Sequence, residues 1–166
     1  MQSITAYIAL GSNLGDRELN IQSALAKLRA TAEIVIVKVA RPFENPAIGG
    51  PPDSPPFLNT AAEIRTTLDP HPLLHRLLEI EREMGRQRRE KWGPRLIDLD
   101  LILYGDLILT TDDLILPHPL MHQRQFVLEP LAEIAPEVVH PEIKRTVREL
   151  LGEIQNPKSK IPKKTK

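Results

Sequence analysis

Two aspartates, Asp98 and Asp100, stand in an apolar segment that runs from Gly93 to Tyr104. If this segment is a β-strand, alternate side chains share a face, so the two carboxylates lie side by side with Cα atoms about 6.6 Å apart. Because aspartate is disfavoured in strands and neighbouring anions repel each other, a cation is expected close by. Mg²⁺ prefers carboxylate oxygen and keeps water and substrate phosphate in its coordination shell. Two such carboxylates could hold two metal ions about 3.5–4 Å apart, or they could form a solvated face paired with nearby arginines.

The segment that leads into this strand, Gly85 to Arg95, contains five basic residues. Guanidinium groups match phosphate oxygens in charge and geometry, so this segment could close over a polyphosphate held beside the aspartates. A charged loop considered alone is usually a solvated surface feature, and that alternative stays open. The position of the loop directly before the two acids favours the functional interpretation.

Glu81 and His118 are the other candidates for a role in a site. Glu81 falls within the apolar stripe of a predicted helix, and a carboxylate on the buried side of a helix needs a partner. It either forms a structural ion pair, lies at a frayed helix end, or supports a site beside the aspartates. His118 stands between two prolines that restrict its backbone, which suits a fixed contact but also a simple proline-rich turn. The predicted stripe around Glu81 consists of Leu73, Leu74, Leu77, Leu78, Ile80 and Met84.

Elements that would carry these residues follow from the hydrophobic pattern. Strands are predicted at residues 4–10, 34–39, 57–67, 96–104 and 107–109, the last two as a hairpin across Gly105-Asp106. Helices are predicted after Asp16, from Asp69-Pro70 to about Met84, and over residues 143–151. This order predicts an α+β fold, a ferredoxin-like sandwich in which an antiparallel sheet carries helices on one face. Alternation assigns Ile97, Leu99, Leu101 and Leu103 to the core face, and Leu96, Asp98, Asp100, Ile102 and Tyr104 to the other face.

Composition limits the classes of protein that fit. The 166 residues predict one domain, residues 1–155, followed by a basic and disordered tail, residues 156–166. The absence of cysteine excludes disulfides, thiolate metal sites and cysteine nucleophiles. Without the five lysines of the tail, 17 basic and 22 acidic residues give a net charge of −5, which disfavours general binding to nucleic acid. With no apolar run near the ~20 residues of a membrane span and no signal peptide, we expect a cytoplasmic protein without membrane contact.

Taken together, these segments resemble the 6-hydroxymethyl-7,8-dihydropterin pyrophosphokinase family of folate biosynthesis. The likeness covers about residues 4–152 and is most specific from Trp92 to Tyr104. It is carried by the stretches Tyr7 to Gly15, Phe57 to Ala61, Ile80-Glu81 with Gly85-Arg86, Trp92 to Asp100, Leu116 to Pro119, Arg124 to Leu128 and Pro130-Leu131.

The resemblance implies an activity and a ferredoxin-like fold. Members of the family transfer the β,γ-diphosphate of ATP to the hydroxymethyl oxygen of the pterin and release AMP. By resemblance, Asp98 and Asp100 hold two Mg²⁺ ions on the phosphates of the co-substrate ATP, and Glu81, from its place in the apolar stripe, is the candidate for a supporting role. The catalytic-loop arginines are Arg86 and Arg95, and the ATP contacts are His118, Arg124 and Arg95. The pterin contacts are Phe57 and Phe126 as two stacking rings, Asn59 as the amide that reads the polar edge, Trp92, and the backbone at Asn45, Pro46 and Ile48.

Three features depart from the family pattern. Asn45 stands where a small hydroxyl residue is expected, and Asp113 stands where some relatives place a basic nucleotide contact. The segment from Arg86 to Trp92 is about one residue shorter than in some relatives, so the roles of Arg88 and Arg89 stay unassigned.

The predicted mechanism is an in-line attack of the pterin hydroxyl on the β-phosphorus, with no evident general base. Two other functions fit the same residues: a different Mg²⁺-dependent nucleotidyl- or phosphotransferase, and a non-catalytic ligand-binding or interaction module. The expected partners are the two small-molecule substrates alone, and we expect a monomer.

Overall fold

A computed structural model describes residues 2–45, 56–85 and 96–156 of the chain. Its main sheet is antiparallel, with the strand order β2–β4–β1–β5. The short strand β3 pairs with the first residues of β4, on the same edge where β2 pairs with the last ones. This order and the intervening helices are those of the ferredoxin-like sandwich, so the predicted fold class is confirmed. The strands are β1 (Ile4–Ser12), β2 (Ile34–Val39), β3 (Phe43–Asn45), β4 (Phe57–Thr66) and β5 (Asp98–Tyr104).

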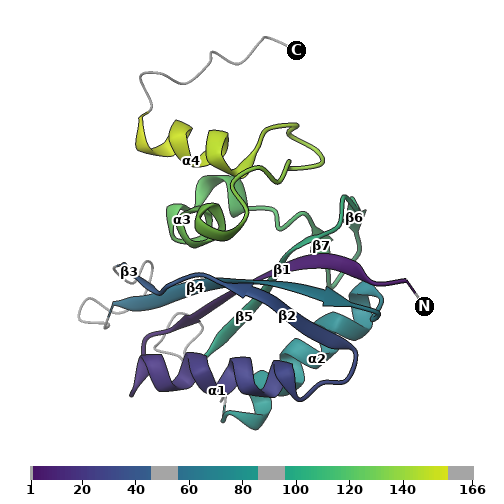
Figure 1. Cartoon of the computed structure of the whole chain (residues 1–166), viewed down its shortest axis with the longest axis vertical. Helices are drawn as coiled ribbons and strands as arrows, with labels where there is room; N and C mark the ends of the chain where they lie inside the picture. Colours follow the sequence, from purple (N-terminus) through teal and green to yellow (C-terminus); the bar gives the residue numbers. More distant parts are fainter. Residues whose placement is uncertain (1, 46–55, 86–95, 157–166) are drawn as a thin grey trace.

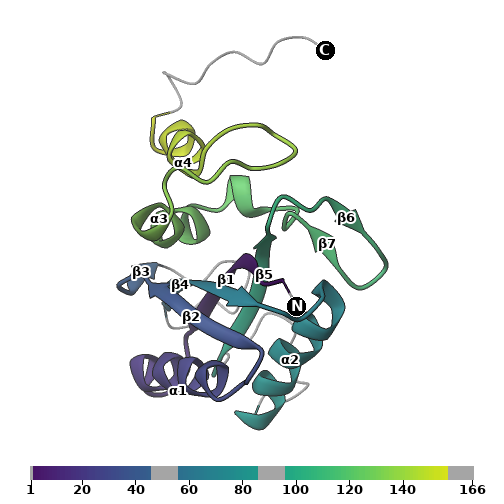
Figure 2. The same ribbon diagram turned by 45° about the vertical axis from the view of Figure 1, so that its right-hand side comes forward.

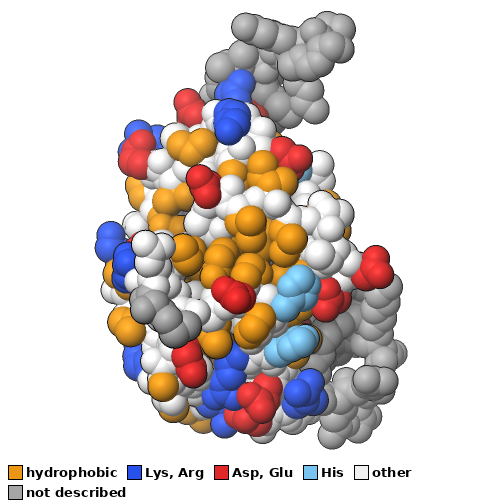
Figure 3. All heavy atoms as spheres, turned by 90° about the vertical axis from the view of Figure 1, so that its right-hand side faces the viewer, with side chains coloured by type: hydrophobic (Ala, Val, Ile, Leu, Met, Phe, Trp, Pro, Cys, Tyr) orange, Lys and Arg blue, Asp and Glu red, His pale blue; other side chains and the backbone are white. Residues whose placement is uncertain are grey.

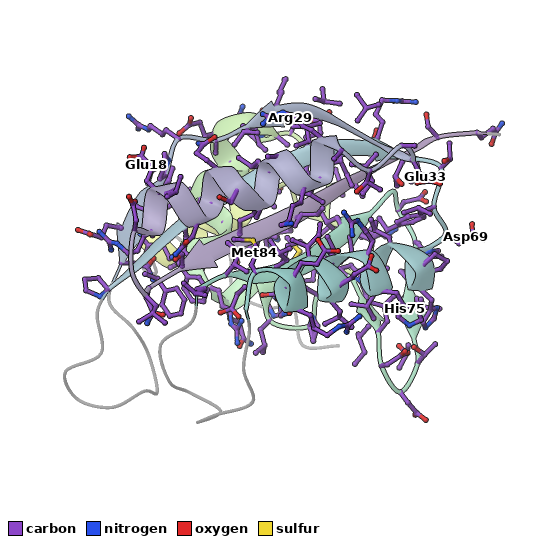
Figure 4. The ribbon with its side chains drawn as sticks, turned by 90° about the horizontal axis from the view of Figure 1, so that it is seen from below. Glu18, Arg29, Glu33, Asp69, His75 and Met84 are labelled. Carbon is purple, nitrogen blue, oxygen red and sulfur yellow. The ribbon has the colours of Figure 1, made fainter. Side chains whose placement is uncertain are left out.

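Helices α1 (Arg17–Arg29) and α2 (Pro70–Glu83) lie side by side across one face of the sheet (Figures 1 and 4). α1 begins where predicted, and the carboxylate of Asp16 accepts the Leu19 N–H at 3.1 Å. α2 begins with proline in its first turn, as predicted, although the Asp69 side chain makes no capping hydrogen bond to the described residues. Its end is set by Gly85, whose φ of 91° is a conformation that other residues rarely adopt.

The opposite face of the sheet is covered in part by α3 (Gln125–Ile134) and α4 (Val147–Gln155), which Figure 1 shows above the sheet. The sequence pattern predicts helices on one face alone and does not predict α3, because Pro130 in its middle is a strong helix-breaking signal. The predicted start of the last helix, residue 143, is too early. The true start is a capping box in which Thr146 and Glu149 satisfy each other's backbone N–H groups.

Strand β5 contains a β-bulge that alters the predicted alternation. Tyr7 pairs with Leu103 and Ile8 with Leu101, so Ile102 is an extra residue on β5. Beyond the bulge the faces exchange: Leu103 packs with α3 and α4, and Tyr104 packs with α1 and α2. The predicted faces of these two residues were therefore wrong, because the register of a strand depends on its partner.

The short strands β6 (Leu109–Thr110) and β7 (Ile115–Leu116) pair with each other in a separate small sheet, seen beside α2 in Figure 2. The predicted hairpin between 96–104 and 107–109 is wrong. The Gly105 N–H at the predicted turn donates instead to the Thr5 carbonyl of β1, at 2.8 Å. Within the described ranges, no helix has the length and apolar character that a membrane span requires.

Candidate active site

An open cavity of about 1440 Å³ lies where β1, β4, β5, α2 and the start of α3 meet. All nine described residues that are expected to form the site line it: Asn45, Phe57, Asn59, Glu81, Asp98, Asp100, His118, Arg124 and Phe126. The other expected site residues, Pro46, Ile48, Arg86, Trp92 and Arg95, lie outside the described residues, as do Arg88 and Arg89.

Asp98 and Asp100 begin strand β5 at alternate positions, so their side chains share a face of the sheet, as predicted. Their neighbours on β1 are small: Gly11 is opposite Asp98, and Ala9 is opposite Asp100. Asp98 is half-buried, whereas Asp100 is exposed. Small cross-strand neighbours leave space above this face, so a ligand can approach both carboxylates.

Glu81 connects α2 to the strand that carries the aspartates. Glu81 is 3% exposed, and its Oε2 accepts the backbone N–H of Leu99 at 2.7 Å. Because β5 is an edge strand, Glu81 supplies an acceptor for an N–H group of that edge. Leu99 lies between the two aspartates in the chain, so this hydrogen bond helps to fix the strand segment that presents them.

His118 is held against β5 by its own backbone. Its N–H donates at 2.9 Å to the carbonyl of Ile102, the bulged residue. Its ring Nδ1 accepts the Leu120 N–H at 3.2 Å, which leaves the proton of the neutral ring on Nε2. Burial, together with the nearby Arg124 charge, lowers the pKa of His118 to about 4. At neutral pH this histidine is therefore an uncharged hydrogen-bond donor.

Aromatic and amide groups gather at the end of the cavity formed by β3, β4 and α3. Phe57 comes from β4, and Phe126 comes from α3 with the Arg124 guanidinium 5.5 Å from its ring centroid. The Asn59 side chain is 7% exposed, and its amide nitrogen donates to Oδ1 of Asn45. This end can hold a flat ring between aromatic faces and satisfy polar groups at its edge.

The other end of the cavity is lined by α2 and by the segment that follows β6. Leu74 and Leu78, assigned to the core stripe of α2, line this end, and Leu78 is 37% exposed. Asp113 also lines it, with Oδ1 3.0 Å from the His71 ring Nε2. The Thr111 hydroxyl and His71 hold the pKa of Asp113 below its ordinary value.

The apolar end of the cavity was not predicted from the sequence. Leucines that line a ligand site and leucines that pack in a core occur at the same helical spacing, so the sequence does not distinguish them. One signal for this end was present in the sequence. Leu74 and Leu78 make the apolar stripe of α2 wider than contact with the sheet alone requires, which indicates that part of the stripe faces something other than the core. Figure 3 shows apolar side chains in the middle of the side of the molecule that carries α2, β6 and β7, with histidine and acidic side chains beside them.

The donor atoms at the two aspartates fit a divalent cation. Within the described ranges, no group of three or more His, Cys, Asp or Glu side chains could hold a metal ion. Two carboxylates leave most of an octahedral shell to water and to phosphate oxygens, which is the arrangement that Mg²⁺ favours. The residues therefore suit a metal ion that binds together with a phosphorylated substrate.

Comparisons with known proteins agree with this geometry. Residues 7–136 match the family described as 7,8-dihydro-6-hydroxymethylpterin-pyrophosphokinase. The 2-amino-4-hydroxy-6-hydroxymethyldihydropteridine pyrophosphokinase of Bacillus subtilis is 47% identical over 133 residues, which cover 80% of this chain and 79% of that protein. The protein of the same name from Synechocystis is 43% identical over 149 residues, covering 90% of this chain and 75% of that protein.

A solved structure gives independent support for the fold. A crystal structure of Plasmodium falciparum HPPK-DHPS with pteroate superimposes with a TM-score of 0.73 at 14% identity. The match covers 98% of this chain and 45% of that chain, so the protein spans less than half the length of this solved relative. The family match and the relatives above 40% identity together show that the chain belongs to the 7,8-dihydro-6-hydroxymethylpterin-pyrophosphokinase family and is a transferase.

Proposed function

We propose that the protein transfers diphosphate from ATP to the hydroxymethyl group of 6-hydroxymethyl-7,8-dihydropterin. The reaction depends on Mg²⁺, releases AMP and is a step of folate biosynthesis. One observation carries the proposal: a single cavity brings together the acidic pair, the half-buried His118 and the aromatic and amide groups. Its volume of about 1440 Å³ exceeds the ~300–1,000 Å³ of a typical single-ligand pocket, so two substrates can bind side by side.

The triphosphate of ATP is proposed to lie over Asp98 and Asp100, which would hold two Mg²⁺ ions. Bound there, Mg²⁺ would offset the negative charge of the phosphates. Neutral His118 can donate a hydrogen bond from Nε2 to a phosphate oxygen, and Arg124 adds a positive charge. The nucleoside would then extend toward the apolar end formed by Leu74 and Leu78.

The pterin is proposed to bind at the opposite end, with its ring stacked between Phe57 and Phe126. Stacking holds a planar heterocycle, and the carboxamide of Asn59 can serve both donor and acceptor groups at its polar edge. The hydroxymethyl group would then point toward β5 and the triphosphate. Pro46, Ile48 and Trp92 are proposed to contact the pterin as well.

In the proposed step, the hydroxymethyl oxygen attacks the β-phosphorus of ATP. A new oxygen–phosphorus bond forms, the bond from the β-phosphorus to the bridging oxygen breaks so that AMP leaves with that oxygen, and the hydroxyl proton is released to solvent water. Such transfers depend mainly on positioning and on stabilising the charge of the transition state. Arg86 and Arg95 are proposed to supply that stabilisation, a role that the sequence resemblance implies.

Product analysis tests this function. The protein is incubated with ATP, Mg²⁺ and 6-hydroxymethyl-7,8-dihydropterin, and both products are identified by chromatography and mass spectrometry. AMP and the pterin diphosphate are expected, with no turnover when Mg²⁺ is chelated. Formation of ADP or pyrophosphate would point to a different transferase, and an absence of turnover would favour a non-catalytic module. The monomeric state, the cytoplasmic location and the division into residues 1–155 and 156–166 stay predictions.

A further inference from the structure

Gly11, near the end of β1, is crowded by the aromatic and amide groups of the cavity. A Cβ atom placed on it would lie 2.7 Å from Oδ1 of Asn59 and 3.4 Å from Cδ1 of Phe57. Real Cβ atoms essentially never approach another heavy atom as closely as the first of these distances. Glycine weakens a strand interior, so its presence here calls for a reason such as the close approach of another group.

Backbone conformation does not supply that reason. Gly15, Gly85 and Gly105 have φ values between 54° and 91°, where a side chain would be strained. Gly11 has no positive φ and pairs regularly within the sheet. What distinguishes Gly11 is therefore the space above its Cα atom.

The register of the sheet places Gly11 between the two halves of the proposed site. On one side it pairs with Asn59 of β4, and on the other side it pairs with Asp98 of β5. Directly paired residues on neighbouring strands project to the same face of a sheet. The space above Gly11 therefore lies between the proposed pterin amide and the first proposed metal ligand.

Asn59 has little freedom to move away from this space. Its side chain is 7% exposed, and its amide nitrogen donates to Oδ1 of Asn45 on β3. A methyl group on residue 11 would have to displace the carboxamide from that hydrogen bond or push β1 and β4 apart. Either movement alters the position of the group proposed to read the pterin.

We infer that Gly11 is a positioning residue for the pterin: its lack of a side chain leaves the space in which the carboxamide of Asn59 lies over β1, next to Asp98. This inference rests on the proposed function. It assigns Gly11 a steric role, because the residue offers no side chain with which to contact either substrate.

The substitution Gly11→Ala tests the inference, with Gly152→Ala as its matched control. Gly152 lies in α4 and a Cβ on it would meet no described atom within 4 Å, so the control adds the same methyl group in open space. For Gly11→Ala the KM for the pterin should rise about 10-fold or more, because small displacements of positioning groups are costly. The KM for ATP should stay within about twofold of the wild-type value, and Gly152→Ala should match the wild type in both constants.

A double-mutant cycle separates positioning of Asn59 from a general disturbance of the sheet. In an Asn59→Ala background the carboxamide is absent, so adding Gly11→Ala should change the pterin KM by less than about twofold. Should Asn59→Ala fold poorly by circular dichroism, Asn59→Ser would serve as the background.

Three results would overturn the inference: normal kinetic constants for Gly11→Ala, equal effects of Gly11→Ala with and without the Asn59 carboxamide, or equal rises in the KM for ATP and for the pterin. Turnover by the wild type separates the two claims. An inactive wild type removes the proposed function together with this inference, whereas an active wild type with a normal Gly11→Ala variant removes the inference alone.

Discussion

The two faces of the central sheet differ in the size of the side chains that the second half of β1, residues 8–11, presents to them. Ile8 and Leu10 point toward α1 and α2 and are almost fully buried. Ala9 and Gly11 point to the other face, opposite the two aspartates. Large aliphatic side chains fill one face with a packed core, whereas small ones leave a hollow in which a site can form. The comparison predicts that substitutions on the two faces have separable effects on stability and on catalysis.

The largest effect on catalysis is expected from Asp98→Ala or Asp100→Ala. Loss of either carboxylate removes a proposed metal ligand, so kcat should fall by at least about 10³-fold. The melting temperature should change little, because removing one of two adjacent anions also removes a repulsion. Steady-state kinetics and thermal melts measure the two effects. Asp106→Ala, in an exposed turn away from the cavity, is the control, and an active Asp98→Ala/Asp100→Ala double variant would refute the metal assignment.

The opposite result is expected for Leu25→Ala, on the buried side of α1. Leu25 is fully buried in the core beneath the sheet, so the free energy of unfolding should fall by about 2–5 kcal/mol. Well below the melting temperature, kcat and both KM values should stay close to those of the wild type. Leu19→Ala, on the exposed side of the same helix, should cost less than about 0.5 kcal/mol. A large loss of kcat in folded Leu25→Ala would mean that the two faces are coupled.

Substitution of Glu81 is expected to affect both stability and catalysis, because Glu81 belongs to the α1–α2 side and yet contacts the strand that carries the aspartates. Glu81→Ala leaves the buried Leu99 N–H without this acceptor, so the free energy of unfolding should fall by about 1–3 kcal/mol. The Mg²⁺ concentration for half-maximal activity should rise as well, because the strand that carries the aspartates is less firmly held. Glu81→Gln keeps an oxygen acceptor and should recover most of both losses. If Gln behaves like Ala, the charge of Glu81 matters more than the hydrogen bond to Leu99.

The α1–α2 face could be predicted from the sequence because local patterns determine it. The β-branched run at 34–39 and the start of α1 at Asp16 were both placed correctly. The exchange of faces after Ile102 could not be predicted, because the bulge depends on pairing with β1. For the same reason the pairing of the two-residue strands β6 and β7 was not predicted, since it is a tertiary event with almost no local signal.

For the candidate site, polar residues were visible in the sequence because they interrupt an apolar pattern, as Asp98, Asp100 and Glu81 do. The space between them was not visible. The role inferred for Gly11 depends on the residues that lie opposite it on two neighbouring strands, and their alignment is a property of the folded sheet. The apolar end at Leu78 was not predicted for a different reason: leucine is equally typical of a ligand contact and of a core contact.

His118, on the site face, makes stability depend on pH, and this effect vanishes near neutral pH. Its pKa is lowered to about 4 from an ordinary value of 6.5, so between these pH values the unfolded chain binds a proton that the folded protein does not. The resulting stability is fully present above pH 6.5 and is lost as the pH falls toward 4. His118→Asn removes the titrating group, while its Oδ1 can still accept the Leu120 N–H. Urea unfolding across this range should therefore show a shallower loss of stability for the variant than for the wild type. Identical slopes would mean that His118 is more accessible to water than its burial indicates and that it is protonated at mildly acidic pH in the folded protein.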